Sequence, residues 1–396
     1  MALPDYDIVT VGGGLAGTAL AKSMAERGAS VLVLEKEPMF KDRVRGEMLA
    51  PWGAAEAREL GLLDLLKEHC AHEVPFVEMG TGPRNLATTT RQLLPGVTFA
   101  HQEMQETILQ AAETAGAEIR RGITVERIEK GHPARVHVQG ATSGAINARL
   151  VVAADGRGSP SRRQAGFTVE DGPLDYFFAG VLLTGVSTAE DLVYFIFNAE
   201  LGTVVGFIPI GQNRFRTYFG YPKSAGFRLQ GEQMVGQFLA ETTRAFAGGA
   251  QLFQRARAIG PLASFDISES WVAHPYDDGV ALIGDAAATS DPSFGQGLNL
   301  TLRDVRVLRD ELAKTSDWEA AGHRYADQHH HYFQNCRTVE GWLRTLFQDP
   351  SAQATAMRNR AFPLIGQDPS RVPDHLFSGP DLPVNATVRA RLFGES

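Results

Sequence analysis

Three segments of the chain place glycine, and two of them also a carboxylate, directly after a short apolar run. The first contains the glycines from Gly12 to Gly17, the second ends in Asp155 and Gly156, and the third contains Gly284 and Asp285. In α/β sheets, residues of this kind follow the carboxyl ends of strands, and ligands bind at that edge. The three segments therefore predict one ligand site at one edge of a parallel sheet.

The first segment is a G-x-G-x-x-G sequence that begins at Gly12, between an apolar run and a helical pattern. Gly12 permits the tight turn, Gly14 lets the backbone approach a pyrophosphate, and Gly17 lets helix and strand pack closely. The unpaired N–H groups at the start of the helix, near Leu15 and Ala16, then face the phosphate. This pattern predicts a dinucleotide site.

The carboxylate that belongs to this dinucleotide site is Glu35, which lies 18 residues after Gly17, at the end of the next apolar run. A carboxylate in this position accepts hydrogen bonds from ribose hydroxyls and repels a 2′-phosphate. The site therefore suits FAD or NAD and not NADP, and Lys36 is assigned to the same site. The alternative is a purely structural glycine turn beside a surface glutamate.

The third segment is the most specific. An apolar run leads into Gly284 and Asp285, and a small-residue loop with Pro292 then leads into a helix that begins near Gly297. Asp285 can hold a polyhydroxyl chain, and the helix N-terminus can stabilise negative charge on a reduced ring system by roughly 1 kcal/mol. A simple connection between strand and helix would not need so many small residues.

Together the three segments, in this order and spacing, resemble the p-hydroxybenzoate hydroxylase-like family of flavoprotein monooxygenases over roughly residues 5–310. The resemblance implies that the first segment binds the ADP half of FAD, that Asp155 lies near the pyrophosphate, and that Asp285 holds the ribityl chain. It implies that Pro292 and Gly295–Asn299 line the isoalloxazine. The predicted FAD residues from these segments are Gly12, Gly14, Leu15, Ala16, Gly17, Glu35, Lys36, Asp155, Gly156, Gly284, Asp285, Gly295, Gly297, Leu298 and Asn299.

The resemblance also assigns a flavin contact to an arginine after the second strand. Arg45 is our choice for this role and Arg43 the alternative; a solvated basic loop is the third interpretation. Relatives carry Arg or Gln at the start of the following long helix, whereas this chain has His101, with Gln105 one turn later. We assign both to the FAD site. The third segment also has Ala288 where the family has histidine.

The resemblance implies a monooxygenase reaction. NADH or NADPH reduces the flavin, oxygen forms a C4a-hydroperoxyflavin, and an aromatic or polycyclic substrate is hydroxylated, with Pro292 and Arg45 as the catalytic residues. A second G-x-G-x-x-G for a nicotinamide domain does not occur. The alternatives on the same scaffold are a reductase or dehydrogenase similar to geranylgeranyl reductases, a flavin-dependent halogenase, and a non-enzymatic FAD protein.

The fold that positions these residues is expected to be α/β: a Rossmann-like FAD-binding domain with an inserted, mainly antiparallel sheet and a helical tail. The predicted FAD domain comprises residues 1–75, 96–170 and 260–316, the substrate domain residues 76–95 and 171–259, and the tail residues 317–396. Aromatic and β-branched runs predict antiparallel strands at Phe177–Leu183, Leu192–Phe197, Thr203–Ile208 and Arg214–Tyr221. Their aromatic residues supply the predicted substrate contacts, Tyr194, Phe207 and Tyr218, beside Pro292, although alternation alone does not show which face is inward.

Composition and charge indicate which partners, metals and cellular location to expect. The chain has 396 residues, 38 basic and 46 acidic, and its net charge of −8 disfavours nucleic acid as a partner. Cys70 and Cys336 lack metal or disulfide spacing, and the triplet His329–His331 lacks metal-ligand spacing, so we predict no metal and a reducing, cytoplasmic location. The longest apolar stretch is too interrupted to span a membrane. The expected partner is a small molecule, bound by a monomer or homodimer.

Overall fold

A parallel sheet forms one half of the molecule. The computed structural model describes residues 3–139, 144–172, 176–246, 248–267 and 269–395. Within them, β1 (Tyr6–Val11) lies in the centre of this sheet, parallel to β2 (Val31–Glu35) on one side and β11 (Gly144–Ala153) on the other. Beyond them lie β8 (Glu118–Arg121) and β21 (Val280–Leu282), also parallel. The carboxyl ends of β1, β2, β11 and β21 therefore meet at one edge.

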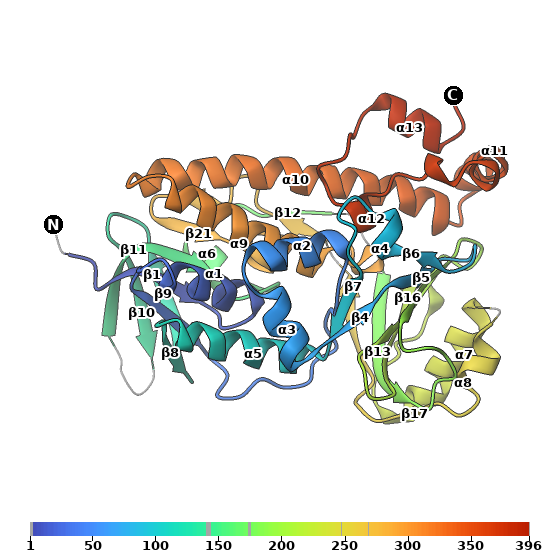
Figure 1. Ribbon diagram of the computed structural model, residues 1–396, viewed down its shortest axis with the longest axis horizontal. Helices are drawn as coiled ribbons and strands as arrows, with labels where there is room; N and C mark the ends of the chain where they lie inside the picture. The colour runs from blue at the N-terminus through green and yellow to red at the C-terminus, as the bar shows by residue number, and fades with distance from the viewer. Residues whose placement is uncertain (1–2, 140–143, 173–175, 247, 268, 396) are drawn as a thin grey trace.

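Helices cover one face of this sheet. α1 (Leu15–Ala25) packs between α5 (His101–Thr114) and α9 (Gly297–Ala313). The four final residues of β1 and all five of β2 are buried, which explains their nearly continuous apolar sequences. The opposite face is covered by a ribbon of β9 (Thr124–Glu129) and β10 (Ala134–Gln139), which extends from β11 (Figure 1).

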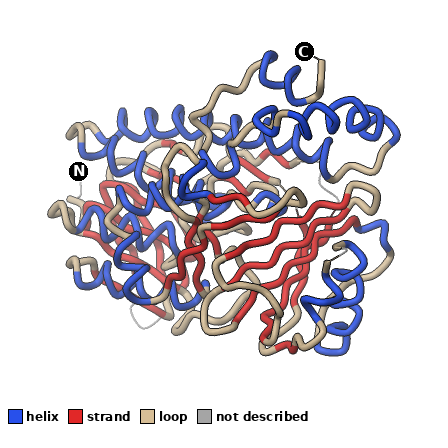
Figure 2. Tube along the Cα trace, turned by 45° about the vertical axis from the view of Figure 1, so that its right-hand side comes forward, coloured by secondary structure: helices blue, strands red, loops and turns tan. Residues whose placement is uncertain are grey.

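A mainly antiparallel sheet forms the other half (Figure 2). Its central strands are β13 (Tyr176–Thr184), β16 (Arg214–Pro222), β15 (Thr203–Pro209) and β14 (Leu192–Asn198), and β5 (Phe76–Glu78) joins β14 in parallel. Helices α7 (Val235–Ala245) and α8 (Gly249–Phe253) belong to the apolar layer on one face. The opposite face is turned toward the parallel sheet.

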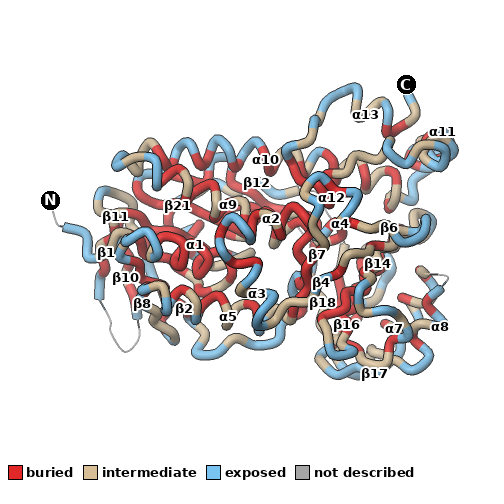
Figure 3. Tube along the Cα trace, viewed as in Figure 1, coloured by how far each residue is buried: buried red, intermediate tan, exposed pale blue. Residues whose placement is uncertain are grey.

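The tail contributes a helix of 30 residues, α10 (Trp318–Phe347), which packs along α9 and extends over both halves of the molecule (Figure 1). Its inner side is buried and its outer side is exposed (Figure 3). The chain then forms α11 (Ala352–Gln367), α12 (His375–Ser378) and α13 (Ala386–Leu392). Within the described residues, no helix combines the length and apolar character needed to cross a bilayer.

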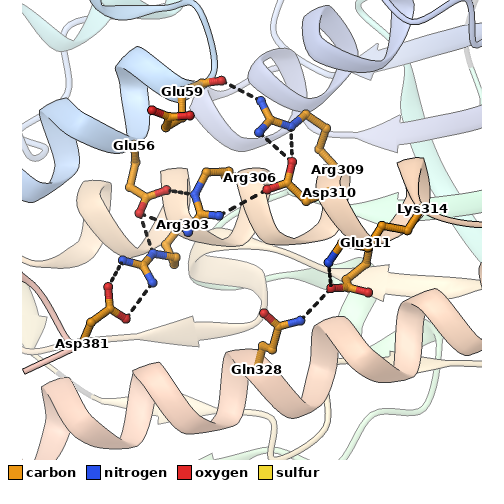
Figure 4. A network of polar contacts seen from close by, with 10 residues as sticks. All are labelled: Glu56, Glu59, Arg303, Arg306, Arg309, Asp310, Glu311, Lys314, Gln328 and Asp381. Atoms are coloured by element: carbon orange, nitrogen blue, oxygen red, sulfur yellow. Dashed lines mark hydrogen bonds and ion pairs between the residues drawn. The ribbon is translucent and has the colours of Figure 1, made fainter. Parts of the chain in front are cut away.

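Buried charges join α9 to α2 (Pro51–Glu59). Glu56 is nearly buried and lies between two arginines of α9; Arg303 Nε is 2.6 Å from its Oε1, and Arg306 Nε contacts its Oε2 (Figure 4). Arg303 also pairs with Asp381 of the tail at 2.8 Å. This network fixes α2, α9 and the tail relative to one another.

The predicted fold class is confirmed. The four aromatic strands each extend only one residue or two beyond the predicted ranges.

The contact of α10 with the parallel sheet gives a first prediction. A Cβ added at Gly322 would lie 2.2 Å from the ring of Tyr276, which is buried, so Gly322→Ala should destabilise the protein by about 1–3 kcal/mol. Gly341→Ala in the same helix meets nothing within 4 Å and should be neutral or stabilising, by about 1 kcal/mol at most. Urea unfolding of both variants measures the difference. Equal stabilities would contradict the packing described.

Candidate active site

A cavity of about 990 Å³ lies between the carboxyl edge of the parallel sheet and the inner face of the antiparallel sheet. All three segments identified in the sequence line it. Gly12, Asp155 and Asp285 reach it from the ends of three neighbouring strands, as the strand order requires.

The three glycines of the first segment occupy distinct environments. Gly12 has φ +109°, which favours glycine, and a Cβ at Gly17 would lie 2.0 Å from the carbonyl oxygen of Gly12. Gly17 therefore lies behind the cavity, at the contact of helix and strand. At Gly14 a Cβ would meet only the Gln105 side chain, at 3.5 Å, so its open side faces the cavity. This open surface fits a pyrophosphate.

Glu35 lies at the end of β2 and is nearly buried. Its Oε2 accepts a hydrogen bond of 2.6 Å from the N–H of Gly13, and its Oε1 accepts one of 2.8 Å from Glu37. These bonds hold the carboxylate against the glycine turn at the cavity wall. A carboxylate has about four acceptor positions, so capacity remains for ribose hydroxyls.

Asp155 and Gly156 also line the cavity, but Asp155 has a structural task as well. It accepts hydrogen bonds from the N–H of Ser161, at 3.0 Å, and from the hydroxyl of Ser159. Ser159 caps α6 (Pro160–Gln164) through the N–H of Arg162. Asp155 therefore fixes the start of a helix at the edge where the pyrophosphate is expected.

Asp285 faces the cavity, and within the described part of the chain no hydrogen bond or ion pair occupies its carboxylate. Burial raises its pKa, although Arg45 and Arg157 oppose the shift. The preceding Gly284 does not line the cavity; its N–H donates to Asp304 of α9 at 2.7 Å. Asp304 in turn accepts hydrogen bonds from His329 and Tyr332 of α10. An unoccupied, half-buried carboxylate on a fixed loop fits a polyhydroxyl ligand.

The loop before α9 brings Pro292, Gly295, Gly297 and Leu298 to the cavity, but not Asn299. The Asn299 side chain is fully buried; it accepts from the N–H of Ala50 at 3.0 Å and donates to the Gly295 carbonyl at 3.1 Å. The expectation that Asn299 contacts the cofactor is therefore corrected. Both ends of its amide hold the start of α2 and the loop.

Arg45 and Arg43 differ in their surroundings. Arg43 forms an ion pair of 2.8 Å with Glu37, whereas the Arg45 side chain has no ion pair or hydrogen bond within the described residues. Arg45 lines the cavity and lies close enough to Asp285 to lower its pKa. These surroundings favour Arg45 over Arg43 for the flavin contact. Lys36, which follows Glu35, also lines the cavity.

His101 and Gln105 reach the cavity from the first turns of α5. His101 Nδ1 is 2.8 Å from the carbonyl oxygen of Gly46 and must donate to it, because a carbonyl only accepts. Burial lowers the pKa of His101 to about 4, so the ring is neutral near pH 7. His101 therefore positions the segment that carries Arg45 and adds no positive charge.

The antiparallel sheet forms an aromatic wall. Phe178, Phe195, Phe197 and Tyr218 line the cavity together with Val204, Gly206 and Ile208. Tyr194 and Phe207 point to the opposite face, where their rings meet edge to face at 5.9 Å beneath α7 and α8. The expected substrate contacts of Tyr194 and Phe207 are therefore corrected by strand parity, and Phe195 and Phe197 occupy the inward positions. Tyr218 and Pro292 remain at the cavity.

A buried charge cluster joins this wall to the Arg45 segment. Glu47 is fully buried, and both of its oxygens accept from Arg216 Nε of β16, at 2.9 and 3.0 Å. The Tyr218 hydroxyl contacts the Glu47 carboxylate at 2.9 Å and also the Arg45 carbonyl oxygen. Burial raises the pKa of Glu47 to about 7, against the effects of Arg216 and Tyr218. Sequence analysis missed this cluster, since Glu47 and Arg216 lie far apart in the chain.

The tail completes the cavity with Leu376 and Phe377 of α12. Gln296, which precedes α9, donates to the Leu376 carbonyl at 3.3 Å and accepts from the Trp52 indole at 3.0 Å. No sequence signal marked Leu376 and Phe377, because their place depends on how the tail docks.

The glycine geometry gives a second prediction. Gly14→Val should fold with normal stability but lose FAD, because its side chain would occupy the open side of the turn. Gly17→Val should fail to fold, since its Cβ would meet the Gly12 carbonyl. Circular dichroism and the flavin content of the purified proteins distinguish the two outcomes. A Gly14→Val protein with full flavin content would show that the pyrophosphate lies elsewhere.

The buried Glu47 gives a third prediction. Its pKa is higher in the folded protein than the ordinary 4.5, so the folded state keeps a proton that the unfolded state releases as the pH rises. Its contribution to stability should therefore fall by about 3 kcal/mol between pH 4.5 and about pH 7. Urea unfolding of wild type and Glu47→Gln over this range should show the gap shifting in favour of the variant. Parallel pH profiles would contradict the shift.

Comparisons of sequence and of structure find similar proteins that are named as monooxygenases. A 6-methylpretetramide 4-monooxygenase from Streptomyces rimosus is 28% identical over 337 residues, covering 78% of this chain and 75% of that protein. Squalene monooxygenase from Rattus norvegicus is 25% identical over 346 residues, covering 80% of this chain but only 56% of that protein. The solved structure of a p-nitrophenol 4-monooxygenase from Pseudomonas putida DLL-E4 has a TM-score of 0.79 at 20% identity, covering 94% of this chain and 96% of that chain.

The family match extends over most of the chain. Residues 5–340 match the family described as FAD binding domain. This match includes all three segments identified in the sequence and confirms the predicted resemblance and cofactor. The chain therefore belongs to the FAD binding domain family and is an FAD-dependent flavoprotein.

Proposed function

We propose that this chain is a monooxygenase that uses FAD, NADH or NADPH, and oxygen to hydroxylate an aromatic or related organic substrate. The observation that carries the proposal is that groups suited to FAD and an aromatic wall line the same cavity. The similarity to a 6-methylpretetramide 4-monooxygenase supports the same reaction class. The two unpaired cysteines are consistent with action in a reducing compartment such as the cytoplasm.

FAD, when bound, would accept hydride from the nicotinamide and activate oxygen for transfer to the substrate. The groups that would hold it are the open turn at Gly14 and the carboxylates Glu35 and Asp285, with Arg45 as the unpaired cation. The residues of this chain would then have to orient the substrate, stabilise charge and exclude water.

The start of α9 is suited to charge stabilisation. Gly297 and Leu298 form the first turn of this helix and line the cavity, so N–H groups that lack helical partners lie at its wall. A helix of 17 residues concentrates partial positive charge at that end. Pro292, in the preceding turn, lines the same part of the cavity.

Exclusion of water is the task we assign to the apolar side chains. Phe195 and Phe197 from β14, Phe294 from the loop before α9, and Phe377 from the tail converge on the cavity. Phe197 stacks on Phe294 with ring centroids 5.6 Å apart, which joins the sheet to the loop. Such a lining favours a substrate with aromatic surface.

Anaerobic reduction of the flavin by NADH and NADPH tests the function, with and without a panel of phenols, indoles and polycyclic aromatics. We expect at least one compound to accelerate reduction roughly tenfold or more, equivalent to about 1.4 kcal/mol of barrier. The same compound, turned over under ¹⁸O₂, should gain one labelled oxygen. Reduction of the compound without oxygen consumption would instead identify a reductase, and a flavin that neither nicotinamide reduces would overturn the proposal.

A further inference from the structure

The histidine triplet of α10 divides between the surface and the interior of the molecule. His330 and His331 are exposed, whereas the side chain of His329 is buried, with 3% of its surface exposed. Its ring stacks on Phe333 of the same helix, with the ring centroids 5.8 Å apart. A polar ring in the interior needs a hydrogen-bond partner, and the partner indicates what the residue does.

The partner of His329 is Asp304 of α9. His329 Nδ1 lies 3.0 Å from Asp304 Oδ1, and Nδ1 must carry a proton because a carboxylate oxygen accepts. His329 Nε2 is buried and has no hydrogen-bond partner within the described residues, so a proton there would be an unsatisfied donor. The tautomer with its proton on Nδ1 therefore fits the site, and His329 serves as a donor to Asp304.

Asp304 is a buried carboxylate without a basic partner. Its side chain is 2% exposed, and no lysine or arginine pairs with it in the part of the chain that the structure describes. Three hydrogen bonds compensate its charge instead. The N–H of Gly284 donates to Oδ2 at 2.7 Å, and His329 and the Tyr332 hydroxyl, the latter at 2.5 Å, donate to Oδ1. Since a buried charge is costly without such bonds, Asp304 depends on two donors from the tail helix.

Gly284 connects this buried group to the cofactor loop. It has φ +61°, and a Cβ there would lie 3.1 Å from Thr301 of α9 and 3.3 Å from Ala16 of α1. Gly284 is therefore confined between two helices while Asp304 holds its N–H. Asp285 follows directly and faces the cavity. A displacement of the Asp304 carboxylate would consequently displace the carboxylate of Asp285 as well.

Asp304 also acts on Asp285 through its charge. Burial raises the pKa of Asp285, and the negative charge of Asp304 raises this pKa further. Hydrogen bonds to a carboxylate disperse its charge onto the donors. His329 and Tyr332 therefore influence both the position of the Asp285 carboxylate and the electrostatic potential around it.

We propose that His329 and Tyr332 are positioning residues for the flavin: they hold Asp304, which holds Gly284 and directs the carboxylate of Asp285 toward FAD. Neither residue lines the cavity, so the proposal assigns them no contact with FAD itself. It extends the cofactor site into the tail. The proposal goes beyond the monooxygenase function and does not depend on it, because the chain belongs to an FAD binding domain family.

The affinity for FAD and the midpoint potential of the bound flavin test the proposal in His329→Leu and Tyr332→Phe, each of which removes one donor to Asp304. We expect the Kd for FAD, from titration of the FAD-free full chain, to rise about tenfold in each variant. The potential of the bound flavin should become more negative, because a less compensated Asp304 opposes the negative charge of reduced flavin. Wild-type affinity and potential in both variants would overturn the proposal.

His329→Asn tests whether the donor itself is what matters. The side-chain amide of asparagine places an N–H near the position of histidine Nδ1, where it can donate to Asp304. This variant should recover most of the affinity that His329→Leu loses and keep the wild-type potential. An asparagine variant as weak as His329→Leu would contradict the proposal. If His329→Leu does not fold, Tyr332→Phe carries the test, since it loses only a hydroxyl group.

Two controls separate positioning of the flavin from general support of α10. Tyr276→Phe removes a hydrogen bond of 2.5 Å to Glu319, a contact between α10 and the parallel sheet that does not involve Asp304. It should lower the melting temperature and leave the flavin potential unchanged. His330→Leu alters an exposed neighbour in the same triplet and should resemble wild type.

A shift of the potential in Tyr276→Phe as large as that in Tyr332→Phe would show that the tail acts only through the stability of the fold, and would overturn the proposal. None of these measurements uses a nicotinamide, oxygen or a substrate. Failure of the positioning role is therefore distinguishable from failure of the proposed monooxygenase function.

Discussion

The ion pair between Glu47 and Arg216 is the contact on which the geometry of the cavity depends. Glu47 belongs to the segment that carries Arg45, and Arg216 lies on β16 of the antiparallel sheet. Their side chains are 0% and 2% exposed, so removal of Arg216 would leave Glu47 buried without its cation, at a cost of roughly 3–5 kcal/mol. The pair thus fixes the distance between the residues expected to contact the flavin and the wall expected to contact the substrate.

Helix α9 holds the cofactor side in the same way, through buried polar side chains. Asp304 fixes the loop before Asp285, and Asn299 fixes the start of α2 and the loop before α9. Each of these groups has partners on at least two elements. Loops held from several sides need little rearrangement when a ligand binds, and such preorganisation is what makes electrostatic stabilisation effective.

The tail also helps to form the cavity. Asp374 pairs with Arg84 at 2.7 Å, and the Ser378 carbonyl accepts from Gln92 at 2.9 Å, on either side of the two residues that line the cavity. The tail is therefore fastened to the segment that precedes β7 (Gly96–Phe99). The shape of the apolar end depends on residues far apart in sequence that meet only after the tail has docked.

The sequence by itself determined the local parts of this protein. The turn at Gly12, the open position at Gly14 and the carboxylate of Glu35 follow from a strand, a tight turn and a helix that are contiguous in the chain. Steric limits on φ and on the approach of helix and strand act within a few residues, so their signature is readable from residue type and spacing. The order of the three segments then identified the family.

The tertiary structure alone decided which side chains face the cavity. All seven residues of β15 are buried, because helices cover one face and the core shared with the parallel-sheet half covers the other, so no polar alternation distinguishes Phe207 from Ile208. Asn299 turned away from the cavity because the docking of α2 supplied it with a backbone partner. Glu47 acquired its role from Arg216, a partner 169 residues away whose position depends on the pairing of two sheets. Such long-range contacts leave no local pattern in the sequence.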